Sequence, residues 1–427
     1  MARLKTKDFV GRLGPGIITG AADDDPSGIA TYSQAGAQFR FGLVWTLLLT
    51  TPLMIGIQML SARIGWVTTE GLTANLRKVC PPWLSFTLIA LLVVANTINI
   101  AADIGAMGEA VRMLAGGPLV LYVIGIGGVC IATQLFFSYE GTVRILKWLT
   151  LALFAYVGVI LTVSVQWRQA IHESLRPWAF LPAHTSVQDY AAMVVAVLGT
   201  TISPYLFFWQ AAQEVEDNRR RPRSAELRQY PEYAAEHLSR IKQDTWVGMI
   251  FSNSIALCIV VATAVTLNQH GITNIQTATQ AAQALRPVAG EFAFAVFALG
   301  IIGTGFVAVP VLAGSAAYAV SELYGWKAGL SRGFHEARGF YLIIVAATGI
   351  GTLISYLEVD PIKALVFSAI VNGVISVPIM AALMWIGQST HIMGAYTIST
   401  RHRVFGWAAT LFMAVAVLVM LATTPWW

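Results

Sequence analysis

The sequence predicts an all-α polytopic membrane protein of about eleven transmembrane helices, with helices 1 and 6 broken near their middles. Three observations lead to this prediction. Hydrophobic residues make up 56% of the 427 positions and charged residues only 11%, whereas about a quarter of the residues of a soluble protein are charged. The apolar residues fall into long runs. Two of those runs contain a central proline beside small polar residues.

Each apolar run is long enough to cross the hydrocarbon core of a bilayer, which is about 30 Å thick. Together they predict one transmembrane domain over residues 1–427 that lies in the lipid bilayer. The eleven runs cover residues 14–39, 43–64, 84–113, 117–137, 145–166, 189–212, 244–268, 290–320, 337–356, 361–386 and 404–423.

The basic residues predict how the chain is oriented, because loops rich in Lys and Arg stay in the cytoplasm. With the N-terminus inside, 21 of the 27 basic residues lie in the cytoplasmic tail and loops. The outer side then holds only Arg40, Arg112, Arg168, Arg176, Arg286 and Lys363. We therefore expect a multi-pass protein of the cell membrane with a cytoplasmic N-terminus and an outer C-terminus. Residues 1–12 are short and basic without a cleavage signature, which indicates a tail rather than a cleaved signal.

Several other classes of function have little support in the sequence. The three cysteines, Cys80, Cys130 and Cys258, form no CxxC pair, so neither a disulfide framework nor a structural zinc site is predicted. No nucleophile–base pair suggests an enzyme, and no motif suggests a cofactor or an obligate protein partner. The basic segment 213–243 is interpreted as a cytoplasmic loop facing lipid headgroups rather than as a nucleic-acid site.

The two interrupted runs occupy matching positions in the chain. Pro26 follows Asp23-Asp24-Asp25, and Pro204 follows Gly199-Thr-Thr-Ile-Ser203. Proline removes a backbone donor and clashes with the preceding turn, so both helices should break there. The runs lead two successive five-helix sets, 1–166 and 189–386, and 404–423 adds an eleventh helix. An odd number of spans inverts the second set, and broken helices in inverted repeats are typical of a transport site.

The three aspartates of the first break predict a bound cation. Each mid-span Asp costs about 2.5–3.5 kcal/mol on insertion scales. Asp25 could simply cap the helix that Pro26 begins, but capping does not explain why the carboxylate lies so deep. A cation between the two breaks would offset the cost, helped by the negative ends of the half-helices. Asp25 is the first candidate ligand, and Asp24 and Asp23 are further candidates.

Around these residues the chain resembles the Nramp family of divalent metal transporters, most closely its magnesium-transporting branch. The first break reads Asp25-Pro26-Ser27-Gly28-Ile29-Ala30-Thr31, and Gln34-Ala35-Gly36-Ala37 follows it. Span 2 matches over Ala62–Thr68 with Gln58, and span 3 matches through Ala101-Ala102-Asp103. The resemblance implies a LeuT-type fold with an inverted five-plus-five repeat. It also places Gln34, Asn96, Asp103 and Tyr205 along the transport pathway.

The sequence departs from the family pattern at the implied metal site. The family's metal-binding Asn falls on Gly28, and its span-6 Met-Pro-His falls on Ser203-Pro204-Tyr205. The resemblance therefore implies an all-oxygen set of Asp25, Ser203 and the freed carbonyl of Thr200, with open space at Gly28. Carboxylates, carbonyls and water suit Mg²⁺ and Mn²⁺, whereas thioethers favour softer metals. Mg²⁺ usually keeps several waters and binds through one or two carboxylates.

The resemblance also bears on energy coupling and leaves alternatives open. Asn96, Tyr205 and Gln210 stand where relatives carry Glu or His, and none of them titrates near neutral pH. We therefore expect transport of Mg²⁺, and also of Mn²⁺, without proton coupling. The nearest alternative is a proton-coupled Mn²⁺/Fe²⁺ importer. A Na⁺-coupled amino-acid symporter of the same fold is more distant, because Asp25 would repel a substrate carboxylate.

Overall fold

The computed structural model describes residues 15–136, 150–176, 185–220, 231–356 and 360–424, and in these residues the chain forms helices and no strand. Nine of the helices in this part are long and apolar enough to cross a membrane, and a pair bent by 109° at residues 163–166 would make a tenth. The predicted all-α membrane fold is therefore confirmed. The fifth predicted run, 145–166, begins outside the described residues and continues as η1 and α9.

The first half of the described chain contains ten elements. They are α2 (Pro15–Asp23), α3 (Pro26–Phe39), α4 (Val44–Thr68), α5 (Leu72–Val79), α6 (Pro82–Ala115), α7 (Leu119–Phe136), η1 (Thr150–Leu153), α9 (Phe154–Thr162), α10 (Trp167–Leu175) and α11 (Val187–Thr201).

The second half continues with α12 (Pro204–Arg220) and the long α14 (Pro231–Thr266). The elements that follow are η3 (Asn268–His270), α15 (Ala278–Ala282), η4 (Gln283–Leu285), α16 (Arg286–Ala289), η5 (Gly290–Phe292), α17 (Ala293–Tyr324), α18 (Arg338–Ser355), α19 (Pro361–Gln388), α20 (Thr390–Met393), η6 (Gly394–Tyr396) and α21 (Thr400–Thr423). Helix thus occupies much of the segment 213–243 that was predicted as a loop, and residues 221–230 lie outside the described part.

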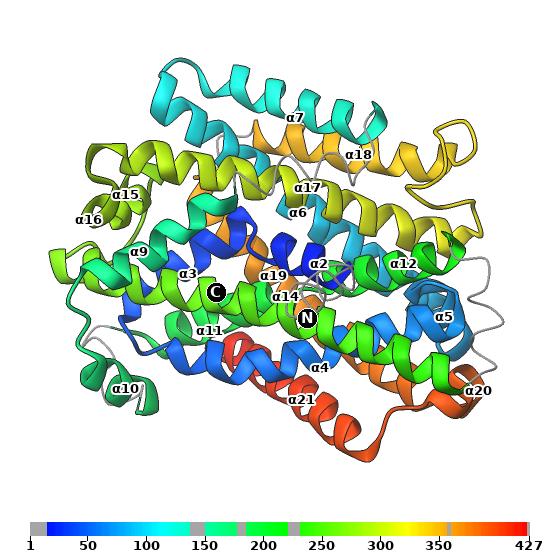
Figure 1. Cartoon of the computed structure of the whole chain (residues 1–427). Helices are drawn as coiled ribbons and strands as arrows, with labels where there is room; N and C mark the ends of the chain where they lie inside the picture. The colour runs from blue at the N-terminus through cyan, green and yellow to red at the C-terminus, as the bar shows by residue number, and fades with distance from the viewer. Residues whose placement is uncertain (1–14, 137–149, 177–184, 221–230, 357–359, 425–427) are drawn as a thin grey trace, which may run out of the picture.

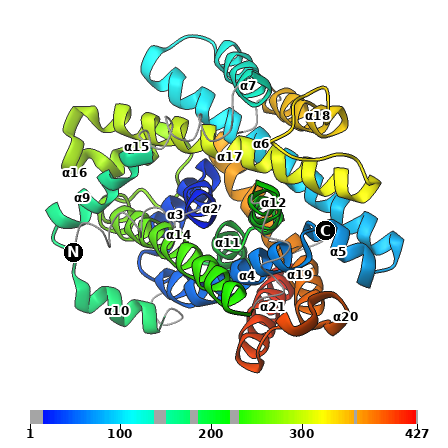
Figure 2. The same cartoon turned by 45° about the vertical axis from the view of Figure 1, so that its right-hand side comes forward.

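The two broken spans lie in the middle of the bundle. Figures 1 and 2 show α2, α3, α11 and α12 surrounded by α4, α6, α14, α17 and α19, with α7, α18 and α21 further out. Contacts between α2 and α14, α3 and α14, α11 and α19, and α12 and α17 fix this arrangement. The breaks are consequently enclosed by protein, where backbone groups without helical partners are tolerated.

Glycines allow the broken helices to approach their neighbours closely. A Cβ at Gly20 of α2 would lie 2.4 Å from the carbonyl oxygen of Gly248 in α14. A Cβ at Gly199 of α11 would lie 2.1 Å from the carbonyl oxygen of Ala369 in α19. Both distances are far inside contact distance, so only glycine fits at either position. Small residues at such crossings are typical of helix packing in membranes.

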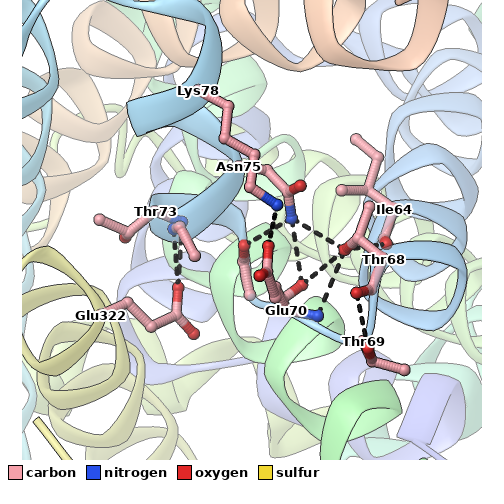
Figure 3. Close-up of polar contacts among 10 residues, drawn as sticks. Ile64, Thr68, Thr69, Glu70, Thr73, Asn75, Lys78 and Glu322 are labelled. Carbon is pink, nitrogen blue, oxygen red and sulfur yellow. Dashed lines mark hydrogen bonds and ion pairs between the residues drawn. The ribbon is translucent and has the colours of Figure 1, made fainter. Parts of the chain in front are cut away.

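The connection between α4 and α5 is held by polar contacts with α17 (Figure 3). A carboxylate oxygen of Glu322 accepts the first free N–H groups of α5, from Thr73 at 3.1 Å and from Ala74 at 3.3 Å. The amide of Asn75 donates to Thr68 Oγ1 at 2.9 Å and to the Gly71 carbonyl at 2.8 Å. The two bonds to Glu322 satisfy donors that a helix start leaves unpaired. They fix α5 against the end of α17.

Candidate functional site

The first break separates α2 from α3 between Asp23 and Pro26, as the sequence predicted. Asp25 is the N-cap of α3, and its Oδ1 accepts the Gly28 N–H at 2.6 Å. Its Oδ2 accepts the Asn99 amide at 3.0 Å and lies 3.4 Å from the Tyr205 hydroxyl. Only 2% of Asp25 is exposed. Capping therefore uses one carboxylate oxygen, while the other faces side chains from two further helices.

The second break separates α11 from α12 at Ile202 and Ser203. Pro204 begins α12 and has no N–H to offer the Thr200 carbonyl four residues earlier. The Ser203 hydroxyl donates instead, at 3.0 Å to the Thr200 carbonyl and at 2.6 Å to the Gly199 carbonyl. The predicted oxygens of Thr200 and Ser203 thus lie beside each other at the break and are buried.

Tyr205 joins the two breaks. Pro26 frees the carbonyl of Ala22 in the same way that Pro204 frees that of Thr200. The Tyr205 hydroxyl lies 3.1 Å from the Ala22 carbonyl, in addition to its approach to Asp25. The Ala22 carbonyl was not singled out from the sequence, although the same proline rule identifies it.

Helix α6 provides a third wall of the site. Asn99 donates to Asp25 and also to Asp103 Oδ2 at 3.2 Å, and Asn372 of α19 donates to Asn99 Oδ1 at 3.3 Å. Asp103 is thereby linked to Asp25 through one amide. Asn99 was not a predicted site residue. Its position four residues before Asp103, on the same face of a helix, was the available signal.

Asp23 and Asp24 face α14. The Ser252 hydroxyl lies 2.5 Å from Asp23 Oδ2 and 3.1 Å from Asp24 Oδ1. Asp23, Asp24 and Asp103 are each no more than 2% exposed, and within the described residues none of them forms an ion pair. One oxygen each of Asp23 and Asp103 also has no hydrogen-bond partner there. The region around the breaks therefore concentrates four buried carboxylates, and no basic side chain of the described chain pairs with any of them.

Gly28 lies where the breaks meet. A Cβ on Gly28 would lie 3.1 Å from Thr200 Oγ1 and 3.3 Å from the Asp23 carbonyl. These distances are tight but not prohibitive. The open space that the sequence predicted at Gly28 is therefore limited, because Thr200 occupies part of it.

Two predicted pathway residues, Asn96 and Gln34, form their hydrogen bonds outside the group of carboxylates at the breaks. The Asn96 amide donates to α17, at 2.9 Å to the Leu312 carbonyl and at 2.8 Å to Ser315. Gln34 contacts the segment after η3, accepting the Ile275 N–H at 2.8 Å and lying 3.3 Å from the Thr273 carbonyl. Gln34 thus connects the far end of α3 to that segment.

Helix α2 is held by hydrogen bonds to two neighbouring helices. The Gly16 N–H donates to Asp244 of α14 at 2.6 Å, and the Thr19 hydroxyl donates to Gln210 of α12 at 2.5 Å. These bonds hold α2 against α14 and α12.

A second acidic group lies on α12 and α14. Ligand atoms of Glu214, Asp217 and His237 lie within 4.8 Å of one another. Arg240 Nη2 lies 2.7 Å from Glu214 Oε2 and 3.5 Å from Asp217 Oδ2, and Trp66 stacks on His237. Arg240 pairs with both carboxylates, so this group is an ion-pair network between the two helices.

Comparison with known proteins gives a consistent family and fold. The profile of the family described as "Natural resistance-associated macrophage protein-like" matches residues 16–423. A divalent metal cation transporter MntH of Acidiphilium cryptum is 28% identical over 403 residues, covering 90% of this chain and 84% of that protein. The MntH of Verminephrobacter eiseniae is 27% identical over 427 residues, covering 96% and 87%.

Solved structures resemble the fold at lower sequence identity. The Eremococcus coleocola manganese transporter, bound to an aromatic bis-isothiourea compound, superposes with a TM-score of 0.73 at 16% identity, covering 96% of this chain and 86% of that one. Mhp1, a nucleobase-cation-symport-1 family transporter, gives a TM-score of 0.54 at 12% identity, covering 96% and 92%. The predicted LeuT-type fold is confirmed by these likenesses.

Proposed function

Because this chain belongs to the natural resistance-associated macrophage protein (Nramp) family, a family of membrane transporters and not of enzymes, we propose that it carries divalent metal ions across the membrane. The metal is the transported substrate, and the chain itself is the transport domain. The observation that carries the proposal is the group of four buried carboxylates around the two helix breaks, Asp23, Asp24, Asp25 and Asp103, none of which forms an ion pair within the described residues. Burying such charges without a partner costs roughly several kcal/mol per ion. A bound divalent cation offsets that cost.

Within this function we propose Mg²⁺, and also Mn²⁺, as the ions carried. Asp25 Oδ2, the Ser203 hydroxyl and the carbonyls of Thr200 and Ala22 supply only oxygen, and oxygen ligands suit these hard cations. Asp24 is a further carboxylate beside the break. The Ser203 and Tyr205 hydroxyls now bond the freed carbonyls, so both must rotate for these oxygens to face an ion.

A proton-coupled Mn²⁺ importer is the second candidate, and one contact favours it. Asp103 is a titratable group joined to Asp25 through Asn99, so protonation of one carboxylate affects the other. The named manganese transporter and the MntH relatives are consistent with this candidate. Asn96 and Gln210, by contrast, are neutral and are held by α17 and by α2. This is why we favour uncoupled transport.

We test the function by metal flux into proteoliposomes. Asp25→Asn keeps the shape of the side chain but removes the charge that offsets dehydration of the ion. Uptake of Mg²⁺ and Mn²⁺ should fall by at least about tenfold, which corresponds to about 1.4 kcal/mol. The matched control is Asp360→Asn, because Asp360 also caps a helix that begins with proline, α19, but lies outside the site.

Asp360→Asn should leave uptake unchanged, which separates loss of charge at a capping residue from loss of a ligand. Near-normal uptake of both metals by a folded Asp25→Asn protein would rule out the proposed site.

A further inference from the structure

A groove separate from the metal site lies between α4, α14, α19 and α21. Figures 1 and 2 both show α4 between α14 and α21, and contacts join α4 to both helices. Residues of all four helices line the groove, which is open on one side. Its lining is basic at one end and apolar along the rest.

Three basic side chains gather at one end of the groove: Arg63 of α4, Lys242 of α14 and His402 of α21. The described residues that line the groove include no carboxylate, and none of the three basic groups forms an ion pair within the described chain. The positive charges of Arg63 and Lys242 are therefore concentrated here, beside the His402 ring, without a carboxylate in the described lining to compensate them.

Arg63 shows that this end has unused donor capacity. Its Nη2 donates to the Thr397 carbonyl at 3.2 Å, but its Nε is buried and has no hydrogen-bond partner within the described residues. A buried guanidinium donor without a partner is costly. The planar guanidinium group matches carboxylate and phosphate oxygens, and no carboxylate lines the groove in the described residues.

The rest of the groove is apolar. Along α4 it runs from Arg63 back through Leu60 and Ile57 to Gly56, a distance of about 10 Å at 1.5 Å per residue. A Cβ at Gly56 would meet nothing within 4 Å, so this end of the groove is hollow. Its opposite wall includes Met384 of α19.

We propose that this groove binds one anionic glycerophospholipid. Its phosphate lies at Arg63, Lys242 and His402, and an acyl chain lies along α4 from Leu60 to Gly56. A basic pocket between transmembrane helices is a recognised site for anionic headgroups. A free phosphate would use only the charged end, whereas the continuous apolar wall requires a ligand with a hydrocarbon chain. The predicted orientation places this end of α4 on the cytoplasmic side.

The test is lipid titration of the delipidated full chain in detergent, followed by native mass spectrometry. The probes are dioleoyl phosphatidylglycerol, dioleoyl phosphatidylcholine with the same chains but no net charge, and inorganic phosphate. Phosphatidylglycerol should bind to the wild type as one tight molecule and with clear preference over phosphatidylcholine. Lys242→Gln and Arg63→Gln should each weaken that binding by about fivefold and reduce the preference.

Gly56→Phe fills the hollow without changing charge, so it should weaken the binding of both lipids equally. Two matched controls should leave binding unchanged. Arg403→Gln removes a charge one residue beyond His402 from a side chain that does not line the groove, and Gly128→Phe adds the same bulk at another open glycine, in α7. Lys242 is exposed, and a side chain at Gly56 would meet open space. The test therefore holds even if Arg63→Gln fails to fold.

Equal binding of the two lipids by the wild type would overturn the proposal. So would an effect of Arg403→Gln as large as that of Lys242→Gln, because diffuse surface charge would then suffice. Competition by inorganic phosphate together with insensitivity to Gly56→Phe would show a phosphate site without a lipid chain, which also contradicts it.

Discussion

Two regions of this protein bury carboxylates in different ways. Toward one end of the bundle, Glu216 is 3% exposed and accepts a hydrogen bond from the Tyr318 hydroxyl and from the backbone N–H groups of Leu330, at 2.6 Å, and Ser331, at 3.2 Å. At the helix breaks, Asp23 and Asp103 are fully buried, yet each keeps an oxygen without a partner in the described residues.

The difference separates a structural carboxylate from a candidate ligand. Glu216 has its hydrogen bonds without any bound ion, and Glu322 likewise caps α5. An oxygen buried without a partner costs about 1–3 kcal/mol, more when charged, so these oxygens of Asp23 and Asp103 destabilise the ion-free protein. Burial of a charge alone therefore does not identify a functional site. What distinguishes the breaks is that four buried carboxylates gather there and that none of them forms an ion pair within the described residues.

The largest effect that tests this comparison is on stability. Glu216→Ala leaves the Leu330 and Ser331 donors without their acceptor, so the free energy of unfolding should fall by about 3 kcal/mol. Asp25→Asn removes one negative charge from a group of carboxylates that repel one another. The melting temperature of the metal-free variant should therefore stay the same or rise. Thermal unfolding in detergent, with and without Mn²⁺, measures the stability of both variants. Equal losses of stability in the two metal-free variants would show that the two kinds of buried carboxylate do not differ.

A smaller effect concerns selectivity at the breaks. Ser203→Met with Gly28→Asn adds a thioether and an amide, and should raise binding of Mn²⁺ and Cd²⁺ relative to Mg²⁺ by a factor of about three to ten. The gain is limited because a side chain at Gly28 must displace Thr200 Oγ1, only 3.1 Å from its Cβ. Competition binding measures the ranking, and Ser203→Ala is the control without sulfur. An unchanged ranking in the double variant would show that ligand softness does not set selectivity.

The smallest expected signal is in proton movement. In liposomes with a pH-sensitive dye inside, entry of Mg²⁺ or Mn²⁺ should cause no acidification, because Asn96, Tyr205 and Gln210 cannot relay protons near neutral pH. An imposed proton gradient should likewise drive no uphill uptake. Metal-dependent proton entry that disappears in Asp25→Asn would instead favour the proton-coupled candidate, with Asp103 as the titrating partner.

The breaks were predictable from the sequence because proline acts locally. Pro26 and Pro204 fix the ends of the half-helices and identify the freed carbonyl of Thr200. The contacts between helices were not predictable in this way. That Ser252 faces Asp23 and Asp24, or that Asn99 bridges Asp25 and Asp103, depends on how α14 and α6 rotate against the breaks.

Asn96 shows the limit of a motif-based expectation. The residue occupies a pathway position by resemblance, which stays a prediction, and in the structure its amide bonds to α17. A polar side chain within an apolar run can serve either role. Only its partners in the folded chain distinguish them.

The most direct measurement of the central claim is the number of Mn²⁺ ions bound by the purified protein and their dependence on Asp25. Titration followed by electron paramagnetic resonance should give one tightly bound Mn²⁺ per chain in the wild type and in Asp360→Asn, with oxygen ligands only. In Asp25→Asn, that affinity should fall by at least about tenfold. A folded Asp25→Asn protein that binds Mn²⁺ with unchanged affinity and stoichiometry would contradict the claim that the ion is held at the helix breaks.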